Sequence, residues 1–119
     1  MTLPTALIIE DDPVLNQVFS LALRGLFEIE VITDGQVALT RLAEFIPSLV
    51  VLDLHLPHVN GMNILNHIRD HPRLAQMRVI LATADARQAE HCQDLADIVL
   101  LKPVNPVQLR ELATRLCSV

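Results

Sequence analysis

The stretch that decides the predicted fold is Ser48-Leu49-Val50-Val51-Leu52-Asp53. An uninterrupted apolar run of this length, rich in β-branched residues, is typical of a strand buried on both faces. Such strands belong to parallel sheets with helices packed on each side. Asp53 ends the run, where packing offers no reason for a charge. Its simplest role would be a helix cap or turn residue, and its alternative role is chemical.

The same alternation of strand and helix extends outward from this stretch. Further strands are expected at residues 6–9, 29–32, 79–81 and 98–101, beside the one at 49–52. Apolar residues at helical spacing lie between the strands. Asp12-Pro13 predicts a capped helix start and Asp34-Gly35 a turn into a second helix, with further helices at about 60–70, 86–95 and from residue 106 onward. The pattern predicts an α/β fold: a doubly wound (βα)5 unit whose five-stranded parallel sheet carries helices on both faces.

Length and composition agree with one domain. The chain has 119 residues, enough to bury a core without disulfides or a structural metal. With 51% hydrophobic but only 3% aromatic residues, that core must consist of aliphatic side chains, as in helix-covered parallel sheets. The strand and helix pattern occupies almost the whole sequence. We therefore expect a single domain over residues 1–119, with no output domain in this chain.

Charge and hydropathy exclude two classes of function. The net charge is −5 and no run of Lys or Arg is present, so no direct contact with nucleic acid is expected. No apolar stretch approaches the roughly 20 residues of a membrane span, and no signal peptide pattern precedes the first strand. A cytoplasmic protein without membrane contact is expected.

The cysteines and histidines do not form a metal-binding pattern. Cys92 and Cys117 lack partners at metal-ligand spacing, and both are expected to be reduced structural thiols. His67 and His71 are separated by one helical turn, but no acidic third ligand of the kind found in zinc helices accompanies them. We interpret the histidines as surface residues.

Polar residues gather where the predicted strands end. These positions are Glu10-Asp11-Asp12, Asp53, Thr83 and Lys102-Pro103. In an open parallel sheet the carboxyl ends of the strands form the binding edge, so these groups should converge. Carboxylates brought close together repel one another unless a cation neutralises them. Carboxylate oxygens and retained water are the ligands that Mg²⁺ prefers, and we therefore expect a magnesium site.

The residue types at this edge suit phosphoryl transfer. An ionised Asp53 beside Mg²⁺ is able to attack phosphorus and form an acyl phosphate. A hydroxyl from Thr83 and an ammonium from Lys102, which is the only lysine in the sequence, would stabilise charge on the phosphoryl oxygens. Alternatively, Thr83 bonds only to backbone and Lys102 is a solvated surface residue. Asp12 is best explained as a helix cap, which leaves Glu10 and Asp11 as metal ligands.

From Ala6 to about Cys117 the chain resembles the receiver domains of two-component response regulators. Residues 7–13 are similar to the acidic pocket of that family, which implies Asp11 as a direct magnesium ligand and Glu10 as a ligand through water. Residues 53–57, with a glycine four residues later, are similar to the phosphoacceptor signature. The resemblance implies phosphorylation of Asp53 and coordination of the metal by the backbone carbonyl of His55.

Two later motifs extend the resemblance. Thr83-Ala84 is similar to the switch hydroxyl with its small neighbour, and Lys102-Pro103 to the lysine followed by a cis proline. The family implies a flavodoxin-like fold and phosphoryl transfer from a histidine kinase or a histidine phosphotransfer protein. It also implies that the protein is a phosphoacceptor that catalyses its own phosphorylation and dephosphorylation. Such a protein is not a conventional enzyme. The face formed by residues 86–95, 98–101 and the last helix would then bind a target protein or a second copy.

Three features depart from the usual receiver pattern. Val99 stands where an aromatic switch residue is usual, the stretch from Asp85 to Asp97 is short, and Leu95 replaces a common glycine. We therefore expect the fourth helix to be shortened or displaced. Asp85 and His55 occupy positions that tune the phosphate lifetime in receivers.

Two other functions compete with a phosphorylated receiver. A degenerate receiver would serve as a binding module without phosphorylation, but all five residues of the expected site are present. A small phosphatase or phosphotransferase with an aspartate nucleophile would require a second aspartate two residues later, where this chain has His55.

Overall fold

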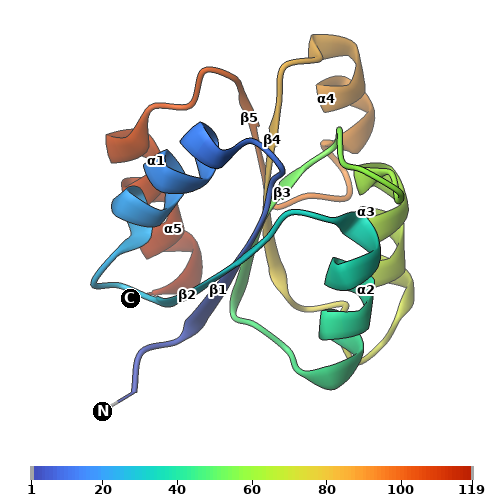
Figure 1. Ribbon diagram of the computed structural model, residues 1–119, viewed down its shortest axis with the longest axis horizontal. Helices are drawn as coiled ribbons and strands as arrows, with labels where there is room; N and C mark the ends of the chain where they lie inside the picture. The colour runs from blue at the N-terminus through green and yellow to red at the C-terminus, as the bar shows by residue number, and fades with distance from the viewer. Residues whose placement is uncertain (1, 119) are drawn as a thin grey trace.

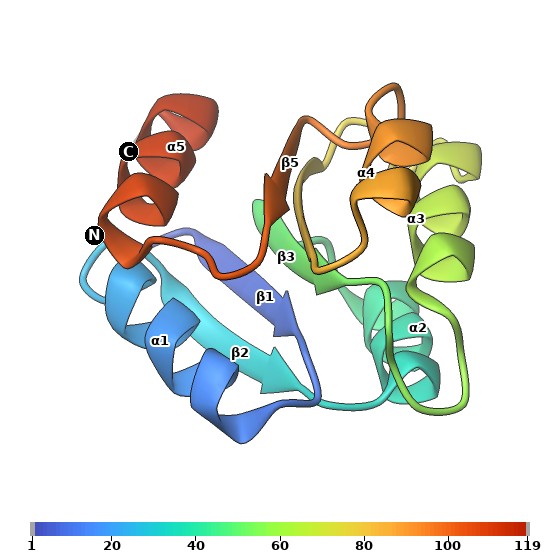
Figure 2. The ribbon, with the colours of Figure 1, turned by 90° about the horizontal axis from the view of Figure 1, so that it is seen from above.

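The computed structural model describes residues 2–118, which form a five-stranded parallel sheet between two layers of helices (Figure 1). The strands are β1 (Thr5–Ile9), β2 (Glu28–Ile32), β3 (Leu49–Asp53), β4 (Arg78–Thr83) and β5 (Ile98–Leu101), in the order β2-β1-β3-β4-β5. The helices are α1 (Pro13–Leu23), α2 (Gly35–Glu44), α3 (Gly61–Asp70), α4 (Ala86–Cys92) and α5 (Pro106–Cys117). Helices α1 and α5 cover one face, and α2, α3 and α4 cover the other (Figure 2). The predicted doubly wound (βα)5 architecture is confirmed.

Strand β3 lies at the centre of the sheet and is buried along its whole length. Its side chains alternate between the two apolar cores, as the period of a strand requires. Val50 and Leu52 pack into the core beneath α2 and α3, whereas Leu49 and Val51 pack into the core beneath α1 and α5. The prediction of a strand buried on both faces is therefore correct, and β3 delivers Asp53 to the carboxyl edge of the sheet.

Every helix begins with an Asp or Asn cap. Side chains of Asp12, Asp34, Asn60, Asp85 and Asn105 accept hydrogen bonds from backbone N–H groups in the first turns of α1 to α5. These bonds satisfy donors that have no partner within a helix. The predicted cap at Asp12 is confirmed. Helices α1, α2 and α4 begin only a few residues after the strands that precede them, so their capped ends lie close to the carboxyl edge of the sheet.

The fourth helix is shorter than the prediction of residues 86–95, because α4 ends at Cys92. The backbone N–H groups of Leu95 and Ala96 both donate to the carbonyl of Cys92, which turns the chain away from the helix axis. Arg69 of α3 then holds the turn: its Nε donates to the Leu95 carbonyl at 2.6 Å and its Nη2 to Asp97 Oδ2 at 3.0 Å. Leu95 and Asp97 lie 26 and 28 residues after Arg69 in the sequence. Apolar periodicity does not report such distant contacts, so it placed the end of the helix too late.

The cysteines are free thiols and the histidines lie mostly at the surface, as the sequence predicts. Neither Cys92 nor Cys117 forms a disulfide, and Cys92 is buried. Among the histidines only His67 is partly buried; the other four are exposed. No helix within residues 2–118 has the length and apolar character needed to cross a membrane.

Replacing Arg69 with Met should strongly destabilise the fold. Arg69 also donates to the carbonyls of Ala75 and Met77, and its side chain is only 19% exposed. The variant would leave these acceptors and Asp97 without their cation, at a cost of about 2–4 kcal/mol in the free energy of unfolding. Urea denaturation followed by circular dichroism measures the change.

The matched control for this prediction is Arg78→Met. Arg78 also pairs with Asp97, but at 3.4 Å and with a side chain that is 53% exposed. Its loss should cost less than about 1 kcal/mol. Equal destabilisation by the two variants would contradict the role assigned to Arg69.

Candidate functional site

The polar residues predicted at the strand ends converge at the carboxyl edge of the sheet. Glu10 follows β1, Asp53 ends the adjacent β3, and Thr83 ends β4 next to it. Lys102 follows β5, and its backbone N–H donates to the Thr83 carbonyl at 2.8 Å. Glu10, Asp53 and Thr83 are buried, whereas the side chain of Asp11 is exposed.

Three carboxylates form an acidic cluster at this edge. Oxygens of Glu10, Asp11 and Asp53 lie within 4.8 Å of one another. Asp53 is only 4% exposed, and its Oδ1 has no hydrogen-bond partner within residues 2–118. Burying a carboxylate without such a partner is costly. A set of hard oxygen ligands with one unsatisfied member fits Mg²⁺ well.

Lys102 is the cation of the cluster. Its Nζ donates a hydrogen bond to Glu10 Oε1 at 2.8 Å. The same Nζ lies 3.4 Å from Asp53 Oδ1, and this contact is an ion pair but not a hydrogen bond. Burial raises the pKa of Glu10, and the hydrogen bond from Lys102 offsets this only in part. Burial alone would lower the pKa of Lys102, but its hydrogen bond to Glu10 and the charges of both acids raise it. Lys102 therefore stays protonated and balances part of the negative charge.

Thr83 ends the strand next to that of Asp53, and His55 follows Asp53 by two residues. Thr83 Oγ1 accepts a hydrogen bond from the backbone N–H of Asp85 at 3.1 Å, which is the local role considered as an alternative in the sequence analysis. Because a hydroxyl accepts and donates at once, this bond leaves the Thr83 proton available to a further acceptor. His55 lies in the loop after β3, and its side chain is exposed. Asp85, a position linked by resemblance to phosphate lifetime, caps α4.

One buried residue that supports the site was missed by the sequence analysis. Asn16 of α1 donates from its side-chain amide to the backbone carbonyl of Glu10 at 2.7 Å and so braces the turn between β1 and α1. It shares the buried side of α1 with Phe19, Ala22 and Leu23. A polar residue within that apolar stripe was the available signal, because buried amides are normally hydrogen bonded.

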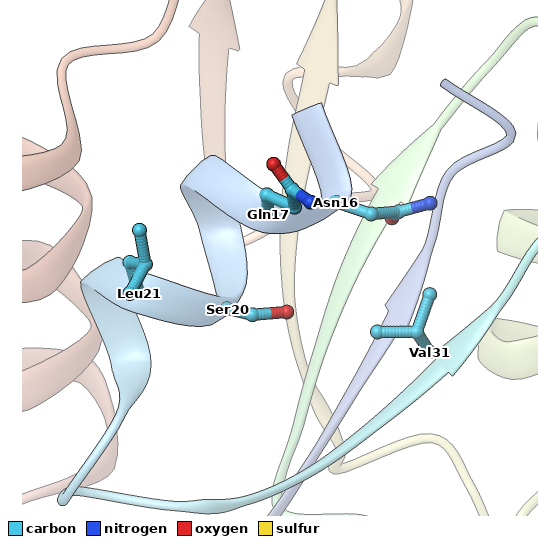
Figure 3. Close-up of a pocket in the computed structure, with 5 residues that line it drawn as sticks. All are labelled: Asn16, Gln17, Ser20, Leu21 and Val31. Atoms are coloured by element: carbon cyan, nitrogen blue, oxygen red, sulfur yellow. The ribbon is translucent and has the colours of Figure 1, made fainter. Parts of the chain in front are cut away.

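Asn16 also lines a cavity of about 460 Å³ between α1 and β2, shown in Figure 3. The other lining residues are Gln17, Ser20, Leu21 and Val31. None of the residues predicted for the site is among them. The acidic cluster is therefore separate from this cavity.

A model of the response regulator receiver domain matches residues 6–114 of the chain. The chain belongs to the response regulator receiver domain family. Its architecture and its acidic edge are those expected from the sequence for a receiver domain of two-component signalling.

Curated relatives support the same assignment. The phosphate regulon transcriptional regulatory protein PhoB of Rhizobium meliloti is 31% identical over 112 residues, covering 90% of this chain and 49% of that protein. The DNA-binding response regulator MtrA of Mycolicibacterium smegmatis is 34% identical over 104 residues, covering 87% of this chain and 46% of MtrA. This receiver domain thus spans about half the length of these relatives.

Solved structures show the same fold. The receiver domain of a signal transduction histidine kinase from Syntrophus aciditrophicus superposes with a TM-score of 0.86 at 28% identity, covering 97% of this chain and 90% of that one. The BeF3-activated receiver domain of DrrB gives a TM-score of 0.87 at 25% identity, with 99% and 100% of the chains covered. The chemotaxis response regulator CheY4 of Vibrio cholerae, at 21% identity, shares the fold with a TM-score of 0.86, covering 97% and 99% of the two chains.

The Asp53→Asn variant should be more stable than the wild type when no metal is present. The substitution removes a buried charge that repels Glu10 and Asp11, and the interaction it gives up is a single 3.4 Å ion pair with Lys102, which keeps its hydrogen bond to Glu10. A gain of about 1–3 kcal/mol in the free energy of unfolding is expected, measured by urea denaturation in the presence of a chelator. Added magnesium should narrow the difference, because it stabilises the wild type more than the variant.

The control for this prediction is Asp12→Asn. Asp12 is an exposed neighbour in the same turn, and asparagine caps a helix as well as aspartate does. This variant has the same change in charge and should unfold like the wild type. The interpretation of Asp53 would be wrong if both variants were stabilised equally.

Proposed function

We propose that this receiver domain accepts a phosphoryl group on Asp53 in a magnesium-dependent reaction with a histidine kinase or a histidine phosphotransfer protein. The observation that carries the proposal is the buried Asp53 carboxylate. Its Oδ1 lacks a hydrogen-bond partner within residues 2–118, two further carboxylates lie within 4.8 Å, and Lys102 Nζ lies 3.4 Å away. These contacts support the assignment of Asp53 as the nucleophile, of the neighbouring acids as metal ligands and of Lys102 as the cation for the phosphate.

The residues that would hold the metal are Asp11, Asp53 and the backbone carbonyl of His55, with Glu10 contacting it through water. Asp11 is exposed and free to turn toward an ion, whereas Glu10 is already engaged by Lys102 and by the backbone N–H of Asp12. When bound, Mg²⁺ supplies charge neutralisation for the acids and for the phosphoryl oxygens. The oxygen ligands suit a hard divalent ion.

The proposed transfer is a simple displacement at phosphorus. A carboxylate oxygen of Asp53 attacks, the new phosphorus–oxygen bond forms, and the phosphorus–nitrogen bond of the donor histidine breaks with its electron pair remaining on the imidazole. Lys102 is close enough to Asp53 to move from Glu10 to a phosphoryl oxygen, and Thr83 has a hydroxyl proton to donate. The domain is itself the acceptor, so it is proposed as a phosphoprotein that catalyses its own modification and later hydrolysis, and not as a conventional enzyme.

The proposed output is a change at the face formed by α4, β5 and α5, where a target protein or a second copy would bind. Leu101 of β5 is 52% exposed there, and Val99 is half-buried where most receivers carry an aromatic switch residue. We propose that the change passes through Thr83, whose hydroxyl accepts from the backbone N–H of Asp85 at the start of α4. With a net charge of −5, this domain itself is proposed to act in the cytoplasm without direct contact with nucleic acid or membrane.

Acetyl phosphate with magnesium should phosphorylate the wild-type domain once. Mass spectrometry of the intact protein should show one added phosphoryl group, lost on incubation as the acyl phosphate hydrolyses. Asp53→Ala and Asp53→Asn should show no addition, because both remove the nucleophile and the second preserves its shape.

The same measurement separates this function from a degenerate receiver. Absence of any added mass in the wild type, despite native folding, would favour a binding module that works without phosphorylation. Addition that persists in Asp53→Asn would assign the nucleophile to another residue.

Asp11→Ala should sharply weaken magnesium binding. The substitution removes an exposed carboxylate that is free to coordinate, so we expect a loss of at least about tenfold in affinity. Isothermal titration calorimetry is suitable, since the chain lacks tryptophan and tyrosine as fluorescent probes. Asp12→Asn serves as the matched control and should bind magnesium like the wild type. Unchanged affinity in Asp11→Ala would mean that the wrong acid has been assigned to the metal.

A further inference from the structure

The loop of residues 54–60 connects Asp53 to α3 and carries the carbonyl of His55. Its two ends are drawn together by a hydrogen bond from the Gly61 N–H to the Leu54 carbonyl at 2.9 Å. A Cβ at Gly61 would lie 2.3 Å from the carbonyl oxygen of Asp53, so only glycine allows this approach. The course of the loop is therefore set directly against the phosphoacceptor.

The middle of the loop is held by the start of α2, which follows a different strand. The Gly35 N–H donates to the Pro57 carbonyl at 3.4 Å, and a Cβ at Gly35 would lie 2.5 Å from the carbonyl oxygen of Val59. Beside this contact, His58 Nδ1 lies 2.5 Å from Asp34 Oδ2. Two elements that are distant in sequence are thus joined by a close backbone approach and one ion pair.

Asp34 performs two tasks with its two carboxylate oxygens. Oδ1 accepts hydrogen bonds from the backbone N–H groups of Gln36 and Val37 and caps α2. Oδ2 is left for His58, whose hydrogen bond is the main cause of the lowered pKa of Asp34. The cap holds the carboxylate still, so its second oxygen is a fixed acceptor for the loop.

His58 has a backbone conformation that its side chain does not favour. Its φ angle is 68°, in the left-handed region that glycine and asparagine adopt more readily. The side chain is 72% exposed, so packing does not account for the conformation. Asp34 is the only carboxylate within ion-pair distance of the imidazole in the described part of the chain. A hydrogen bond from the Val59 N–H to the Pro57 carbonyl at 2.8 Å closes the turn around His58, and the contact with Asp34 is the side-chain interaction that holds this turn against α2.

We propose that Asp34 and His58 are positioning residues that clasp the loop of residues 54–60 in one conformation and so hold the backbone of His55, whose carbonyl is proposed above as a metal ligand. This inference rests on the proposed function, because it concerns the same magnesium site. The contact of 2.5 Å between His58 Nδ1 and Asp34 Oδ2 joins the loop to the capped start of α2.

Two variants isolate the clasp from the rest of the fold. Asp34→Asn keeps the α2 cap, because asparagine is an equally good cap residue, but removes the negative charge. His58→Asn removes the imidazole while tolerating the left-handed backbone. The double variant tests whether the two residues act as one unit, since coupled residues give effects that do not add.

The first measurement is amide hydrogen exchange without metal. We expect faster exchange at the Gly35 N–H in each variant, because the contact with Pro57 opens more often. The second measurement is magnesium affinity by calorimetry. Each single variant should bind roughly two- to fivefold more weakly than wild type, and the double variant no more weakly than the singles.

Wild-type affinity in both single variants would overturn the proposal, as would fully additive losses in the double variant. A His58→Gly variant adds a further check, since glycine adopts the positive φ without strain. If it retained wild-type affinity, the backbone alone would set the loop and the clasp would be refuted. Failure of the wild type itself to bind magnesium would instead contradict the proposed function, while faster Gly35 exchange in the variants would still support the clasp.

Discussion

Repulsion among the carboxylates of Glu10, Asp11 and Asp53 is the constraint on which the functional edge of this receiver domain depends. A folded protein tolerates such a cluster only when cations or hydrogen bonds offset the cost of gathering negative charge. Here the single lysine of the chain supplies one positive charge, and it is shared between Glu10 and Asp53. The remaining imbalance makes the edge receptive to a divalent cation, so the cost in stability and the capacity for chemistry have the same origin.

The fold meets this constraint by fixing the acids with rigid elements. Asp53 ends a strand whose neighbours on both sides are also strands, and its position is determined by two apolar cores at once. The backbone carbonyl of Glu10 accepts a hydrogen bond from the Asn16 amide, and its carboxylate accepts one from Lys102. Pre-positioned ligands lose little entropy when an ion binds, which favours binding although the metal-free state is costly.

The side of the domain proposed to carry the output is built differently from the acidic edge. Arg69 joins the turn after α4 to α3 and to the start of β4 through four acceptors, so the carboxyl end of α4 is held firmly. The amino end of α4 depends on the Asp85 cap, which is itself hydrogen bonded to Thr83. A movement of Thr83 would therefore act on the amino end of α4 first. The β5 end of this face is also joined to Thr83, because the backbone N–H of Lys102 donates to the Thr83 carbonyl at 2.8 Å.

The sequence by itself determined the fold class, the central buried strand and the residues that gather at its end. Apolar periodicity and capping residues are local signals, and parallel strands place their carboxyl ends together whatever the details of packing. Tertiary structure alone decided where α4 ends, because the partners of Arg69 lie far away in sequence. It alone placed Lys102 on Glu10 as well as near Asp53, and joined Asp34 to His58. Contacts of this kind depend on how two distant segments meet in space, and no periodic pattern in either segment records them.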